Sequence, residues 1–187
     1  MSQVMHDHRQ AFSAHLTAYA EAHPDEGEVA AGFGEFLRSA PTVFERDHAA
    51  GHFTGSAWLV SADGARVLLT HHRKLGRWLQ LGGHADGDTD LAGVALREAE
   101  EESGLAELVA EPAPFDLDCH WIPARAGEPG HWHYDVRYVV RATGSEDFAV
   151  SEESLALAWK PVAEIAADPA ADESLRRMAR KWLRRLG

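Results

Sequence analysis

Cysteine is almost absent from this sequence, which has a single one, Cys119, among 187 residues. One thiol cannot form a disulfide within the chain, so the fold cannot depend on internal cross-links. Chains that do without disulfides are typical of reducing compartments. We therefore expect a cytoplasmic protein.

Long apolar runs are also missing. No stretch of the sequence approaches the roughly 18 consecutive apolar residues that indicate a transmembrane helix. The first ten residues, MSQVMHDHRQ, lack the apolar segment of a secretion signal. We expect no membrane partner.

Basic residues are outnumbered, with 18 lysines and arginines against 30 aspartates and glutamates, and the formal net charge is −12. This balance disfavours sequence-blind binding to nucleic acids or acidic membranes. A polyphosphate would also be repelled unless a metal ion or a local basic patch intervened. Nucleic acid is therefore not the first choice of partner.

Hydrophobic residues make up 45% of the chain and charged residues 26%, which suits one globular domain with added helices. Apolar spacing predicts two N-terminal helices, a β-hairpin, further strands and a last helix from about 172 to 186. We predict an α/β protein in which residues 1–50 form an N-terminal helical extension and residues 51–187 form the main domain. We expect the extension to pack on this domain or on a second copy of the chain, and the latter arrangement would make a homodimer.

Three glutamates, Glu98, Glu101 and Glu102, are spaced i, i+3 and i+4 and fall within one narrow sector of a helix. Like charges held this close repel, and a fold gains nothing from gathering them unless a cation lies among them. Oxygen ligands suit Mg²⁺ or Mn²⁺, and Mg²⁺ commonly also binds substrate phosphates. The spacing therefore indicates a divalent cation and a phosphorylated substrate.

The stretch that contains these glutamates resembles the Nudix box, whose second half reads Arg-Glu-U-x-Glu-Glu-x-Gly-U, where U is a bulky apolar residue. Residues 97–105, REAEEESGL, match it at every fixed charged position and at the glycine, although Ala99 is small for its position. The first half departs from the pattern. With Gly83 as the leading glycine, Thr89 stands where the family has glutamate; with Gly82 leading, Asp88 supplies an acid but the loop is one residue longer.

The resemblance implies a Nudix-type α/β/α sandwich with a mixed sheet. It also implies that the glutamates hold Mg²⁺ or Mn²⁺ with a backbone carbonyl of Gly82 or Gly83, and that Arg97 orients them. Either Glu101 or Glu102 could serve as the general base. A second source of the base is the region before the late strand, where Glu152 and Glu153 lie.

The activity implied is hydrolysis of the pyrophosphate bond in a nucleoside diphosphate linked to another moiety, with water as the nucleophile. The altered first half of the box leaves an alternative, a non-catalytic Nudix-fold module that binds a nucleotide as a regulator. Isopentenyl-diphosphate isomerase, on a related fold, is disfavoured because the strand before the glycine loop, residues 78–81, has no cysteine.

Histidines form a second pattern. His131 and His133 share one face of a predicted strand with Arg137, and His84 follows the glycine pair. One interpretation is a second metal site, or contacts from His84, His133 and Arg137 to substrate phosphates. The other is a polar, solvated strand face. The sequence leaves both open.

Overall fold

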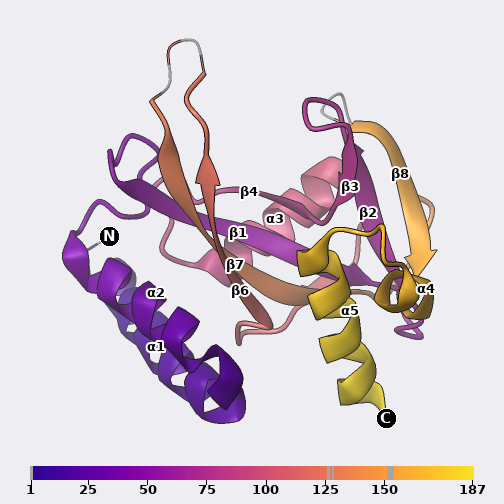
Figure 1. Cartoon of the computed structure of the whole chain (residues 1–187), viewed down its shortest axis with the longest axis horizontal. Helices are drawn as coiled ribbons and strands as arrows, with labels where there is room; N and C mark the ends of the chain where they lie inside the picture. The colour runs from indigo at the N-terminus through magenta and orange to yellow at the C-terminus, as the bar shows by residue number, and fades with distance from the viewer. Residues whose placement is uncertain (1, 126, 128, 151–153) are drawn as a thin grey trace. The chain divides into compact units, whose positions relative to one another are not determined.

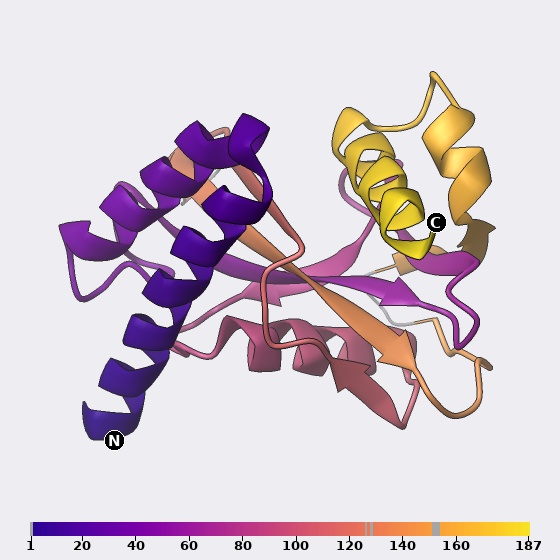
Figure 2. The same cartoon turned by 90° about the horizontal axis from the view of Figure 1, so that it is seen from below.

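The computed structural model describes residues 2–125, 127, 129–150 and 154–187 (Figures 1 and 2). The helices are α1 (Ser2–Ala22), the 3-10 turn η1 (Pro24–Glu26), α2 (Gly27–Ser39), α3 (Leu91–Ser103), α4 (Val162–Ala167) and α5 (Glu173–Leu186). The strands are β1 (Gly51–Val60), β2 (Arg66–His72), β3 (Arg77–Leu79), β4 (Leu81–His84), β5 (Leu108–Ala110), β6 (Asp116–Ile122), β7 (His131–Ala142) and β8 (Ser154–Pro161). A mixed sheet with helices and an N-terminal helical pair confirms the predicted α/β class.

Two compact units make up the chain. The first takes residues from 1–55, 83–94 and 112–138, and the second from 56–82, 95–111 and 139–187. Four elements, β1, β4, α3 and β7, therefore begin in one unit and end in the other. The hydrogen-bonded order of five strands is β3-β2-β1-β7-β5.

An aromatic cluster forms the core of the first unit. The ring of Phe53 in β1 contacts Phe12 of α1, Phe36 of α2 and Phe44 at centroid distances of 5.4, 5.2 and 5.0 Å. Tyr134 of β7 stacks on Phe36 at 3.7 Å. The two N-terminal helices, which lie side by side in Figures 1 and 2, are thus fixed to strands by apolar contacts. A domain boundary after residue 50 stays a prediction.

Strands β6 and β7 form an antiparallel ribbon in the same unit, with Asp116 opposite Arg137 and Ile122 opposite His131 (Figure 1). The predicted strand face shared by His131, His133 and Arg137 exists, but its interpretation as a solvated face is wrong at the Arg137 end. The side chains of Asp135 and Arg137 are buried, because carboxylates and a guanidinium compensate one another there.

Strand β2 organises the second unit. It pairs with β1, with Val60 opposite Val67, and this pairing confirms the predicted hairpin. It also forms antiparallel pairs with β3 and β8. The strand expected over residues 78–81 is interrupted at Gln80, which separates β3 from β4. Strand β8 reaches Pro161, which pairs with Arg66 at the end of the ladder, where its missing N–H matters least.

The basic last helix, α5, buries its apolar side chains within the second unit. Leu175, Met178 and Trp182 are buried, and the indole N–H of Trp182 donates to the carbonyl of Gly64 at 2.8 Å. Asp172 caps the first turn by accepting from the Ser174 N–H. Leu186, the last residue of the helix, is exposed.

Candidate functional site

Helix α3 carries the predicted carboxylates and ends where the sequence predicts. At its start the Asp90 carboxylate accepts from the Gly93 N–H at 3.1 Å, an N-cap that satisfies one free donor of the first turn. At its end Gly104 has φ of 68°, a left-handed conformation that glycine adopts at little cost, and its N–H donates to the carbonyl of Glu100. The helix is therefore fixed at both ends.

One carboxylate of the predicted set is held by the glycine loop, within the second unit. The Gly82 N–H donates to Oε1 of Glu102 at 2.8 Å. This contact needs a glycine, because a Cβ at residue 82 would lie only 2.3 Å from Oγ of Ser56. The missing side chain lets the backbone of the loop approach β1 and orient Glu102.

The other box residues lie on the same helix. Glu98 and Glu102 are half-buried, and Glu101 and Arg97 are exposed. Carboxylates at i, i+3 and i+4 form an all-oxygen donor set, which fits a hard divalent cation. Glu152 and Glu153, the two late candidates for a general base, lie outside the described residues.

The first half of the box has a local structural role. Thr89, at the position where the family pattern has glutamate, is buried with 5% of its surface exposed. The carboxylate of the preceding residue, Asp88, accepts from the Asp90 N–H at 3.0 Å and closes the turn before α3. Neither observation makes Asp88 a metal ligand, and its role as the replacing acid stays a prediction.

A group of histidines lies in the first unit. His52 of β1, His131 and His133 of β7 each present a ring nitrogen, and these atoms lie within 4.8 Å of one another. The ring of His84 in β4 lies 5.0 Å from that of His52 and 5.1 Å from that of His133. The predicted pair of His131 and His133 is thus brought together with His84, and the structure adds His52.

Burial, and then the neighbouring imidazoles, lower the pKa of His52 to about 4 and the pKa of His133 to about 2. Charging either ring would require removing a cation from water and placing it among other imidazoles. Both rings are therefore neutral at pH 7, and each neutral ring keeps one nitrogen lone pair.

Arg137 is the centre of a buried ion network in the first unit. Its Nε donates to Asp135 at 2.8 Å and its Nη1 to Asp116 at 3.1 Å. Burial disfavours the charged guanidinium, but these carboxylates and that of Asp118 outweigh it and raise the pKa of Arg137. Its guanidinium holds strands together, and its predicted contact with substrate stays a prediction.

A family model, the NUDIX domain, matches residues 52–183. The chain belongs to the NUDIX family. The match covers most of the chain and includes the whole of α3 and the glycine loop, in agreement with the resemblance of residues 97–105.

Solved structures of Nudix proteins resemble the chain. A hydrolase of the NUDIX family from Clostridium perfringens is 25% identical, with a TM-score of 0.59, over 73% of this chain and 98% of that one. An Ap4A hydrolase from C. elegans is 16% identical with a TM-score of 0.57, over 72% and 96%. The dihydroneopterin triphosphate pyrophosphohydrolase of E. coli is 16% identical with a TM-score of 0.54, over 71% and 95%. No curated protein matches significantly.

The match to the NUDIX domain, together with the 25% identical hydrolase of that family, identifies this chain as a pyrophosphohydrolase enzyme, which acts on phosphorus acid anhydrides. Among the described residues, no helix has the length and apolar character to span a membrane.

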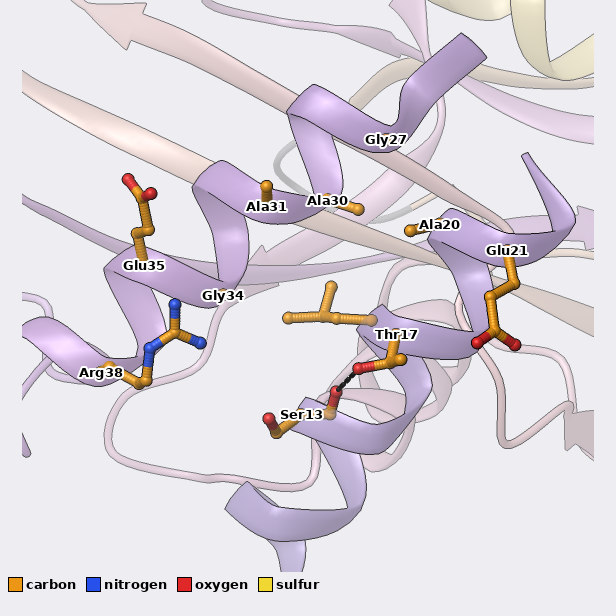
Figure 3. Close-up of a pocket in the computed structure, with 11 residues that line it drawn as sticks. Ser13, Thr17, Ala20, Glu21, Gly27, Ala30, Ala31, Gly34, Glu35 and Arg38 are labelled. Carbon is orange, nitrogen blue, oxygen red and sulfur yellow. Dashed lines mark hydrogen bonds between the residues drawn. The ribbon is translucent and has the colours of Figure 1, made fainter. Parts of the chain in front are cut away.

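A cavity of about 440 Å³ lies between α1 and α2 in the first unit of this Nudix protein (Figure 3). Ser13, Thr17 and Glu21 line it from α1, and Glu35 and Arg38 from α2. Of the predicted catalytic, metal-binding and substrate-binding residues, those that the structure describes do not line this cavity. We assign it no part in the chemistry.

Proposed function

We propose that this Nudix enzyme hydrolyses the pyrophosphate bond of a nucleoside diphosphate linked to another moiety, with Mg²⁺ or Mn²⁺ as cofactor. The observation that carries the proposal is the hydrogen bond from the Gly82 N–H to Glu102, on a helix that also carries Glu98 and Glu101. A bound Mg²⁺ would neutralise charge on the diphosphate and lower the pKa of a bound water.

Each residue of the proposed site has a distinct part. Glu98, Glu101 and Glu102 hold the cation, and the Gly82 N–H fixes the rotation of the Glu102 carboxylate, so the cation meets an oriented ligand. The positive charge of Arg97, four residues before Glu101, offsets repulsion among the carboxylates. Glu101 or Glu102 takes the proton from the attacking water, and Glu152 and Glu153 stay candidates for the same role.

The substrate class follows from the chemistry of the donor set. A dense group of carboxylates repels an anionic substrate unless a bound cation compensates the negative charge of the carboxylates and of the substrate. A diphosphate suits this arrangement, because its oxygens can serve as further ligands of the cation. A phosphorylated small molecule is therefore the proposed partner, in the cytoplasm. A homodimer stays a prediction.

The test is a screen of nucleoside triphosphates, dinucleoside polyphosphates, ADP-ribose, NAD and nucleotide sugars with Mg²⁺ or Mn²⁺, followed by two matched variants. In Glu102→Gln the amide oxygen still accepts from the Gly82 N–H, so the fold is kept while the negative charge is lost. We expect turnover to fall by about 100-fold or more. Glu100→Gln, an exposed change at the variable position of the same helix, should stay within about twofold of wild type.

Two outcomes would contradict the proposal. Near-normal turnover in Glu102→Gln would remove Glu102 from the site. Binding of a nucleotide without metal-dependent release of phosphate or a nucleoside monophosphate would instead favour the non-catalytic regulatory module.

A further inference from the structure

His52 is a buried imidazole that the proposed hydrolysis does not explain. It lies in β1 with none of its surface exposed. Neither of its ring nitrogens has a hydrogen-bond partner among the described residues. Buried polar groups are nearly always paired, because an unpaired group loses its water without compensation. The ring therefore requires a partner that the described part of the chain does not supply.

Two imidazoles of β7 lie next to the ring of His52. Its ring centroid lies 4.9 Å from that of His131 and 4.8 Å from that of His133. The Nε2 atoms of His131 and His133 lie 3.2 Å apart. In a tetrahedral site with metal–nitrogen bonds of about 2.05 Å, two ligand nitrogens are about 3.3 Å apart. The spacing of these two atoms fits two ligands of one ion.

The tautomer of His131 also fits. Its Nδ1 lies 3.0 Å from the carbonyl oxygen of Pro129. Because a carbonyl only accepts, Nδ1 carries the proton, and the lone pair of the neutral ring is on Nε2, which faces His133. Metal-binding histidines characteristically donate their other N–H to such a carbonyl, which fixes the ring.

A hydrogen bond between the two β7 rings would account for part of this arrangement. Nε2–H of His133 could donate to Nε2 of His131 at the observed 3.2 Å. That bond leaves both nitrogens of His52 unpaired in the interior. A shared ion would bind one nitrogen of each of the three rings, including one of the two unpaired nitrogens of His52, so it explains more of the structure than the hydrogen bond does.

We propose that His52, His131 and His133 form a binding site for a divalent transition metal, Zn²⁺ in the first place. Imidazole nitrogens suit Zn²⁺ and its first-row neighbours, whereas Mg²⁺ prefers oxygen ligands, so this site is chemically distinct from the carboxylates of α3. Three histidines leave a fourth position, which water occupies. His133 is then a metal ligand and no longer a contact to substrate phosphates.

The ion would connect strands that are far apart in the sequence. His52 is the second residue of β1, and His131 and His133 lie at the start of β7. Binding an ion to the folded but not to the unfolded chain stabilises the fold. We therefore expect the metal to raise the thermal stability of the protein, whatever its effect on hydrolysis.

The experiment uses the full chain without a histidine tag, stripped with a chelator and held in excess Mg²⁺ so that carboxylate sites are occupied. Co²⁺ is the probe, because tetrahedral Co²⁺ absorbs visible light far more strongly than octahedral Co²⁺. Wild type should bind one equivalent with an intense spectrum, and Zn²⁺ should displace it and raise Tm.

The ligand assignment is tested with His131→Gln and His133→Gln, which should weaken Co²⁺ binding by about 100-fold or more. The matched control is His120→Gln. His120 lies opposite His133 across the ribbon, at a ring distance of 5.5 Å, but is not one of the three ligands. This variant should bind as wild type does.

Several results would overturn the proposal. They are a weak octahedral spectrum in wild type, no rise in Tm with Zn²⁺, or unchanged binding in both ligand variants. An equal loss in His120→Gln would also count against these three ligands. The wild-type spectrum and the Tm shift decide the matter even if a ligand variant fails to fold.

Discussion

Replacing Gly82 with alanine should both destabilise the protein and disable its chemistry. A Cβ at this position would lie 2.3 Å from Oγ, 2.7 Å from Cα and 2.8 Å from Cβ of Ser56. All three distances are too short for carbon contacts, and two involve atoms that cannot rotate away. The backbone of the loop would have to move, and the N–H that holds Glu102 would move with it.

The magnitude follows from two terms. Overpacking a close contact costs about 1–3 kcal/mol, and losing a hydrogen bond to a charged group costs about 1.5–3 kcal/mol. A movement of the loop that relieves the steric overlap also breaks the hydrogen bond to Glu102, so the two costs are not fully additive. We therefore expect a loss near 3 kcal/mol in the free energy of unfolding. For a chain of this size that lowers Tm by about 6–12 °C.

Gly76→Ala is the matched control within the same unit. Gly76 has φ of +63°, so alanine is strained there as well, but a Cβ would meet no atom within 4 Å. Strain alone should cost about 1–2 kcal/mol. Denaturant unfolding and turnover on the substrate found in the screen measure both effects. If Gly82→Ala were no less stable than Gly76→Ala and kept its turnover, the steric argument for the loop would be refuted.

Three further changes test the packing, each by denaturant unfolding. Arg137→Met leaves buried carboxylates without their cation and should cost about 3–5 kcal/mol, whereas Arg125→Met, at an exposed residue, should change stability by less than about 0.5 kcal/mol. Trp182→Phe removes the N–H that donates to the buried Gly64 carbonyl and should cost about 1–3 kcal/mol. Asp90→Ala removes the N-cap of α3 and should cost about 1 kcal/mol. An unchanged midpoint in any of the destabilising variants would contradict the contact behind it.

Local patterns in the sequence are sufficient to predict the helix that carries the carboxylates. The spacing of Glu98, Glu101 and Glu102 and the stop at Gly104 depend only on neighbours along one helix, and the structure confirms that helix. The hairpin of β1 and β2 is predictable for the same reason, since a short turn at Asp63 and Gly64 joins the two strands.

The histidine cluster and the ion network of Arg137 depend on contacts between residues far apart in the sequence, which local patterns do not reveal. His52 stands in a strand in which every residue is buried, so no alternation singles it out, and only the approach of β7 makes it part of a cluster. Arg137 was expected on a polar face because its strand alternates. Its carboxylate partner Asp116 is 21 residues away in the sequence, and no periodicity reports such a contact.

The ion network of Arg137 also has an evolutionary consequence. Asp116 and Asp135 are acceptable in the interior only while the guanidinium is there, and the guanidinium is acceptable only while they are. Substitution of Arg137 leaves two buried carboxylates without their cation, whereas substitution of one aspartate still leaves the guanidinium paired with the other. Simultaneous replacement of all three by apolar residues of similar volume leaves no buried charge. Homologous chains that lose Arg137 should therefore lose Asp116 and Asp135 with it, and these positions should covary.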